Sequence, residues 1–221
     1  MLSVPADPCV RNTYESLQEL LANTRADLTK LAMAHLESKS AYAEAMSSVA
    51  HSSCLRRGHV LQAAIASALQ ASGMYEIWSP HRLYGDIRVE RALGVHATPS
   101  FIEIDIVAFG PGGVLHAVEV VTSLNAISSH RRKTIERRFD LASELLPRWA
   151  AEAGIGFESL SLSLVTLDDP EPEGTYGRAK VTGISAFEDL FNVRVKGCIS
   201  SAMRGFDAAL TPLFVELEAL R

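Results

Sequence analysis

The stretch "SFIEIDIVAFGPGGVLHAVEVV", residues 100–121, decides the fold class. Its first part, 101–109, alternates β-branched and other residues, which predicts a strand. "GPGG" at 110–113 predicts a turn, and the apolar run at 114–121 predicts a second strand. The turn is too short for a crossover connection, so we expect the two strands to form an antiparallel hairpin.

The segments around this hairpin predict an α/β order. A helix follows Gly58, short β-leaning segments occupy 74–91, a second helix starts near 130, and "SLSLSLVTL" at 159–167 predicts a further strand. We therefore expect a mixed central β-sheet flanked by helices.

The outer segments complete the predicted organisation. Residues 12–48 repeat apolar residues at three- and four-residue steps, which predicts an N-terminal helical subdomain or an oligomerisation arm. We expect a strand at 191–196 and a helix from about 200 to 220. The predicted parts are an N-terminal helical segment, 1–54, an α/β core, 55–167, and a C-terminal strand and helix that extend the core, 168–221.

Composition narrows the class of protein. The 221 residues carry a net charge of -5, and no apolar run reaches the roughly 18 residues that a membrane span requires. The first residues lack a basic segment followed by an apolar one, so we expect a cytoplasmic protein with no membrane partner. Three widely spaced cysteines predict free thiols rather than a disulfide framework. No nucleotide-binding loop or serine-hydrolase elbow occurs.

Three acids interrupt the predicted hairpin. Alternation puts Glu103 and Asp105 on one face of the first strand, and Asp105 and Glu119 can project from the same side of the sheet. Two adjacent carboxylates repel unless one is protonated or a cation lies between them, and Mg²⁺ prefers such oxygen ligands. The alternative is a solvated sheet face whose acids pair with arginines. Three valines flank Glu119, which favours a buried carboxylate that needs a partner.

The helix that follows is strongly basic. "SHRRKTIERR" at 129–138 carries five cationic residues: Arg131, Arg132, Lys133, Arg137 and Arg138. Such a run forms either a solvated face with local ion pairs to Glu136 and Asp140 or a surface for DNA phosphates. The sequence leaves both interpretations open.

Together, the hairpin acids, the Gly-led helix before them and the basic helix after them resemble the PD-(D/E)xK nuclease superfamily, over roughly residues 55–167. The resemblance implies a restriction-endonuclease-like αβββαβ core in which Asp105 and Glu119 hold Mg²⁺ and take part in catalysis. Val121 stands where that family has a lysine, so the basic role would pass to Lys133, or else to Arg132 or Arg131. Glu103 is a possible accessory acid, and Gln62 stands where the family often has a glutamate in the first helix.

The resemblance also implies a function. We expect a Mg²⁺-dependent endonuclease that hydrolyses phosphodiester bonds of double-stranded DNA, most simply a homodimeric type II restriction endonuclease. Arg131, Arg132, Arg137 and Arg138 would contact DNA. Val121 favours one alternative, a nuclease-like module without catalysis that binds DNA or protein. A DNA repair or junction-resolving nuclease is the other alternative.

Overall fold

The computed structural model describes residues 58–79, 81–91, 94–168 and 174–218, together with four helical residues of the N-terminal segment, Ala22, Ala26, Asp27 and Lys30. The rest of the helix predicted over 12–48 lies outside the described residues. The chain divides into two compact units, Met1–Ala71 with Arg194–Arg221, and Ser72–Val193. This division differs from the predicted boundaries at 54/55 and 167/168. The candidate site lies in the second unit.

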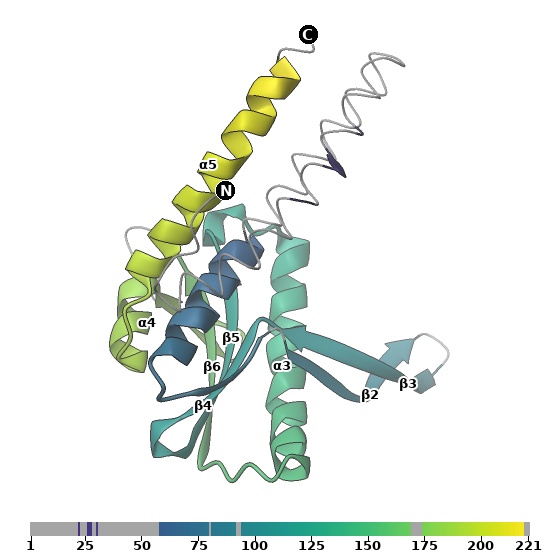
Figure 1. The fold of residues 1–221 in the computed structure, drawn as a ribbon. Helices are drawn as coiled ribbons and strands as arrows, with labels where there is room; N and C mark the ends of the chain where they lie inside the picture. Colours follow the sequence, from purple (N-terminus) through teal and green to yellow (C-terminus); the bar gives the residue numbers. More distant parts are fainter. Residues whose placement is uncertain are drawn as a thin grey trace. The chain divides into compact units, whose positions relative to one another are not determined.

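A six-stranded mixed sheet forms the centre of the second unit (Figure 1). Its strands, in spatial order, are β1 (Glu76–Trp78), β4 (Ile106–Gly110), β5 (Val114–Val121), β6 (Ser159–Thr166), β8 (Ala179–Gly183) and β7 (Thr175–Tyr176). β1, β4 and β5 are antiparallel neighbours, whereas β5, β6 and β8 run parallel. β7 pairs with β8 in the antiparallel sense. The prediction of a mixed α/β fold with a central sheet flanked by helices is confirmed.

The predicted hairpin consists of β4 and β5. The 3₁₀ turn η1 (Pro111–Gly113) connects the two strands, and Gly112 has a φ of 71° there, a conformation that glycine adopts without steric cost. β5 then crosses over to the parallel strand β6 through the helix α3 (Ser129–Glu152).

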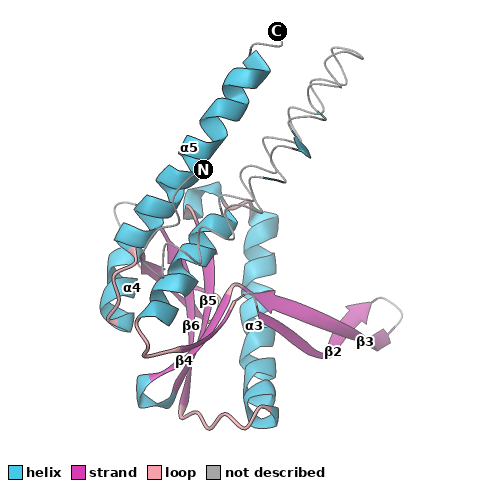
Figure 2. Cartoon of the chain, viewed as in Figure 1, coloured by secondary structure: helices cyan, strands magenta, loops and turns pink. Residues whose placement is uncertain are grey.

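The predicted strand at 101–109 is wrong at one position. The chain bends at Asp105, and residues before the bend belong to a separate two-stranded ribbon of β2 (His81–Arg91) and β3 (Gly94–Ile104) (Figure 2). Two contacts from distant residues hold this bend. The hydroxyl of Ser79 donates to the Asp105 carbonyl over 2.7 Å, and the Val120 N–H donates to the Asp105 carboxylate over 2.8 Å.

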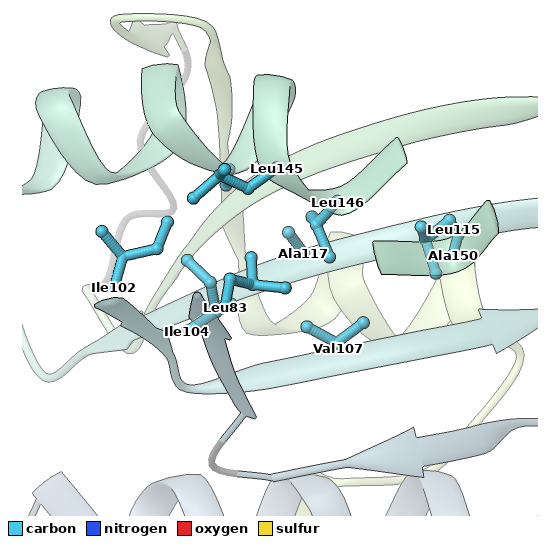
Figure 3. Close-up of a cluster of buried hydrophobic side chains, with 10 residues drawn as sticks. Leu83, Ile102, Ile104, Val107, Leu115, Ala117, Leu145, Leu146 and Ala150 are labelled. Atoms are coloured by element: carbon cyan, nitrogen blue, oxygen red, sulfur yellow. The ribbon is translucent and has the colours of Figure 1, made fainter. Parts of the chain in front are cut away.

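Helix α3 covers one face of the sheet and contributes to two apolar clusters. Ser128 caps its N-terminus by accepting a hydrogen bond from the Arg131 N–H. The first cluster joins the ribbon to α3 and the β4–β5 hairpin (Figure 3), and consists of Leu83, Ile102, Ile104, Val107, Leu115, Ala117, Ala142, Leu145, Leu146 and Ala150. The second cluster lies nearer the start of α3, and consists of Val121, Ile135, Phe139, Leu164, Tyr176, Ala179 and Val181.

The opposite face of the sheet packs against α4 (Ile184–Phe191). His116 of β5 lies between Leu115 and Ala117, which face α3, so alternation directs His116 to the α4 side. Its ring lies 4.5 Å from the ring of Phe191 and 6.3 Å from the ring of Tyr75, measured between centroids. The Tyr75 hydroxyl donates to the Phe191 carbonyl over 3.0 Å, which ties the start of β1 to the end of α4.

The C-terminal part corrects two predictions. No strand forms over 191–196, because α4 ends at Asn192 in the left-handed conformation (φ 49°) and α5 (Lys196–Glu218) follows directly. Strands that extend the sheet occur earlier, at β7 and β8. Cys198 is disulfide-bonded, so the prediction of free thiols is wrong for this residue. Cys9 and Cys54 lie outside the described residues.

The first unit contains the helix of residues 58–71 and α5. Its predicted apolar face is buried: Val60, Leu61, Ala64, Ile65, Ala68 and Leu69. Of the helices that the structure describes, none combines the length and the apolar character that crossing a bilayer requires.

Candidate active site

Asp105 and Glu119 lie close together where the β4–β5 ladder begins. Asp105 directly precedes Ile106, which pairs with Val118, the neighbour of Glu119 on β5. The negative charge of Asp105 acts on the carboxyl of Glu119 and raises its pKa. The Val120 N–H that donates to Oδ2 of Asp105 holds this carboxylate against β5. The structure therefore brings the two predicted acids together.

Glu119 is buried in an apolar setting. Only 4% of the residue is exposed, and it lies on β5 between Ala117 of the first cluster and Val121 of the second. Oε2 accepts a hydrogen bond from Nη1 of Arg138 over 3.1 Å. Oε1 is fully buried and, within the described part of the chain, has no hydrogen-bond partner. A buried oxygen without a hydrogen-bond partner lowers the stability of the folded state by about 1–3 kcal/mol, so a ligand that binds this atom would be stabilising.

Burial and the neighbouring acid change the protonation of Glu119. Desolvation raises the pKa of its carboxyl to about 8, and the negative charge of Asp105 acts in the same direction. The Arg138 guanidinium opposes this rise in pKa, through its charge and its hydrogen bond, without cancelling it. Two carboxylates at close range thus retain a proton near neutral pH unless a stronger cation replaces it.

Arg138 is the cation that α3 brings to this pair. The expectation from the sequence gave the basic role to Lys133 and placed Arg138 among the DNA contacts. Helical spacing was the missed signal: Arg138 lies three residues after Ile135 and four before Ala142, and both of these residues are buried against the sheet. Arg138 therefore lies on the side of α3 that faces β5.

Lys133 is not brought to the carboxylates. It is exposed, and five residues of helix place it about 140° around α3 from Arg138. Arg131 lies seven residues before Arg138, so it shares the side of α3 that Arg138 occupies, two turns nearer the N-terminus. Its side chain is exposed, as is that of Arg137.

Arg132 already has two local partners. Its Nε lies 3.1 Å from Oε1 of Glu136, and its guanidinium lies 4.6 Å from the centroid of the Tyr176 ring. At this residue, the basic helix therefore forms the solvated face with local ion pairs that was one of its two interpretations. Arg178 makes a similar surface pair with Asp140 over 3.3 Å.

The two accessory candidates, Glu103 and Gln62, belong to other elements of the structure than β4 and β5. Glu103 pairs with Arg82 across the β2–β3 ribbon, with 2.9 Å between Nε and Oε2, and Arg82 also lies over the Phe101 ring at 5.0 Å. Gln62 is buried in the helix of residues 58–71, which belongs to the other compact unit. The structure thus gives Glu103 a local ion-pair role.

The loops at the carboxyl ends of β5 and β6 orient α3. Oδ2 of Asp168 accepts hydrogen bonds from the Leu124 N–H over 2.7 Å and from the Thr166 hydroxyl over 3.0 Å. A hydrogen bond from the Ser123 side chain is the largest cause that lowers the pKa of Asp168, followed by the Leu124 bond. These bonds fix the short 3₁₀ turn η2 (Leu124–Ala126) that leads into α3, and so they help to position Arg138.

The acid pair is chemically suited to Mg²⁺. Val121, where the sequence resemblance would place a lysine, is buried in the second cluster, so no base comes from that residue. Among the described residues, no group of three or more His, Cys, Asp or Glu side chains could hold a metal. Mg²⁺ usually binds through one or two carboxylates and takes its other ligands from water and phosphate, so Asp105 and Glu119 with its unpartnered oxygen fit this ion.

Comparisons of the chain with known proteins identify no relative. No protein-family model, no curated protein and no solved structure matches the chain.

Proposed function

We propose that this protein is a Mg²⁺-dependent endonuclease of the PD-(D/E)xK type that acts on double-stranded DNA, and that it is a type II restriction endonuclease. The observation that carries the proposal is the close approach of Asp105 and Glu119, in which one buried carboxylate oxygen of Glu119 has no partner among the described residues.

The order of elements supports the same proposal. Three antiparallel strands, a crossover helix and a parallel strand follow one another as β1, β4, β5, α3 and β6. This is the order that the resemblance implies, with the ribbon of β2 and β3 inserted between the first two strands. The acids lie on β5 and at the bend before β4, where that family carries its acids.

Each residue of the site has a proposed role. Asp105 and Glu119 bind the ion, which when bound lowers the pKa of a water molecule and stabilises charge on the phosphate. Arg138 supplies positive charge from α3 in place of the missing lysine. Arg131 and Arg137 are exposed on the same helix and are suited to DNA phosphates, which position a duplex without reading its sequence. A cytoplasmic homodimer would let two sites act on the two strands.

A second candidate function rests on Val121. An apolar residue buried at the lysine position favours a nuclease-like module that binds DNA or protein without cutting it. A repair or junction-resolving nuclease would share the chemistry of the acid pair and differ only in its substrate.

Cleavage assays with matched variants test the proposal. The purified full chain is incubated with supercoiled plasmid and Mg²⁺, beside Asp105→Asn, Glu119→Gln and the control Glu103→Gln. Asn and Gln preserve shape and one acceptor oxygen, so the fold should tolerate them. We expect the wild type and Glu103→Gln to cut into discrete fragments, and the two site variants to lose cleavage.

The other outcomes identify the alternatives. Retention of plasmid in a gel shift without cutting indicates the binding module. Preference for branched over linear duplexes indicates the repair or junction-resolving nuclease. Cleavage that survives in both site variants contradicts the assigned site.

A further inference from the structure

We propose that Arg138 is an exchangeable counter-ion: it holds Glu119 when no metal is bound, and it transfers to a DNA phosphate when a divalent ion occupies the acid pair. This inference rests on the proposed function and adds to it a mechanism that couples metal binding to DNA binding.

The geometry of the ion pair supports exchange. Nη1 of Arg138 donates to Oε2 of Glu119 over 3.1 Å, while Oε1 remains without a partner among the described residues. The carboxylate side chain is 5% exposed and the arginine side chain is 39% exposed. The guanidinium therefore reaches from solvent to the buried acid, and it can leave without unfolding α3.

Charge gives the direction of the exchange. A divalent ion held by Asp105 and Glu119 brings two positive charges to the carboxyl group whose Oε2 already accepts the hydrogen bond of Arg138. The two cations repel each other, and the ion binds the negative charge of Glu119 that held the Arg138 guanidinium. A long, partly exposed arginine then finds its best new partner in a phosphate, which its planar group binds through two parallel hydrogen bonds.

The position of Arg138 on α3 indicates where that phosphate lies. Arg131 shares the same side of the helix and is exposed two turns away, so a released Arg138 would extend a basic row along α3. Metal binding at the acid pair would thus strengthen DNA binding, and by reciprocity DNA would strengthen metal binding.

Calorimetry and DNA binding test the exchange without measuring cleavage. Ca²⁺, which also takes oxygen ligands, is titrated into the full chain of the wild type, Arg138→Met and the control Arg148→Met, which removes an exposed arginine of α3. We expect Arg138→Met to bind Ca²⁺ about tenfold more tightly, because a competing charge is gone. A short duplex followed by fluorescence anisotropy should bind more tightly with Ca²⁺ in the wild type and in Arg148→Met, but not in Arg138→Met.

Two further measurements keep the test decisive if Arg138→Met folds poorly. Arg138→Lys keeps the charge, so its Ca²⁺ affinity should stay within about threefold of the wild type. In the wild type, the NMR signal of the Arg138 side-chain N–H should shift as Ca²⁺ is added. Equal Ca²⁺ affinity in wild type and Arg138→Met, with binding still lost in Glu119→Gln, overturns the exchange and leaves the proposed site standing. Absence of Ca²⁺ binding in the wild type overturns both.

Discussion

Arg138 of α3 donates a hydrogen bond to Glu119 of β5 over 3.1 Å, and this ion pair lies between two apolar clusters under the same helix. The pair joins α3 to the sheet between these two clusters. Arg138 lowers the pKa of Glu119, so removing the arginine changes the charge of the acid.

Removing Arg138 should cost stability in the absence of metal. Breaking a fully buried ion pair costs about 3–5 kcal/mol, and the partial exposure of Arg138 reduces this. We expect Arg138→Met to lower the free energy of unfolding by about 1–3 kcal/mol, measured by urea denaturation with a chelator present and at a pH above 8, where Glu119 is ionised. Combining it with Glu119→Gln should recover most of the loss, whereas Arg137→Met should change little. Equal stability of Arg138→Met and wild type would show that the pair contributes nothing.

The stability of the protein should depend on pH through Glu119. Its carboxyl has a folded-state pKa near 8 against an ordinary value of 4.5, so the folded state retains a proton that the unfolded state has lost. Stability from this group is therefore complete below pH 4.5 and declines as pH rises towards 8, by at most about 1.4 kcal/mol per pH unit. Glu119→Gln should lack this decline in metal-free buffer. Parallel pH profiles for the two proteins would contradict the assignment.

His116 should act in the opposite pH direction. Burial lowers the pKa of its imidazole to about 4, and its Nδ1 has no partner among the described residues. The unfolded state therefore binds a proton first as pH falls, and stability is lost between about pH 6.5 and pH 4. His116→Phe should remove this acid sensitivity and retain the contact with Phe191. Thermal denaturation across this pH range measures the difference, and an undiminished acid loss in the variant would sink the prediction.

The first cluster should contribute strongly to the free energy of unfolding, because it packs residues of the ribbon against α3. Ile104 is fully buried in that cluster, so Ile104→Ala should lower the free energy of unfolding by about 2–5 kcal/mol. The rings of Trp78 and Trp149 lie 4.9 Å apart beside this cluster, so tryptophan fluorescence during urea denaturation reports its loss. The exposed Leu190 provides the control, because Leu190→Ala should stay within about 0.5 kcal/mol of the wild type.

The hairpin and its acids could be predicted because their signals are local. Alternation and a short glycine-rich turn determine which side chains share a face, and the register that pairs Ile106 with Val118 follows from them. The bend at Asp105 could not be predicted in this way. Ile104 and Ile106 continue the alternation across it, and the contacts that hold the bend come from Ser79 and Val120, distant in sequence.

The basic partner of Glu119 could not be predicted from residue type. A lysine at 133 matches the residue type that the resemblance implies, whereas the helix presents Arg138 to the sheet by its phase relative to Ile135 and Ala142. The predicted strand at 191–196 does not form, because Asn192 in the left-handed conformation ends one helix and Lys196 starts the next. In both cases, packing against distant parts of the chain and the helix ends determined the structure, and neither is visible in the local sequence.

Asp105 is the single residue between the last residue of β3 and the first residue of β4. One backbone position therefore connects β3 of the ribbon to β4 of the six-stranded sheet and also carries an acid of the site. A rotation of β3 relative to β4 changes the main-chain dihedral angles of that residue, and so the direction of its carboxylate.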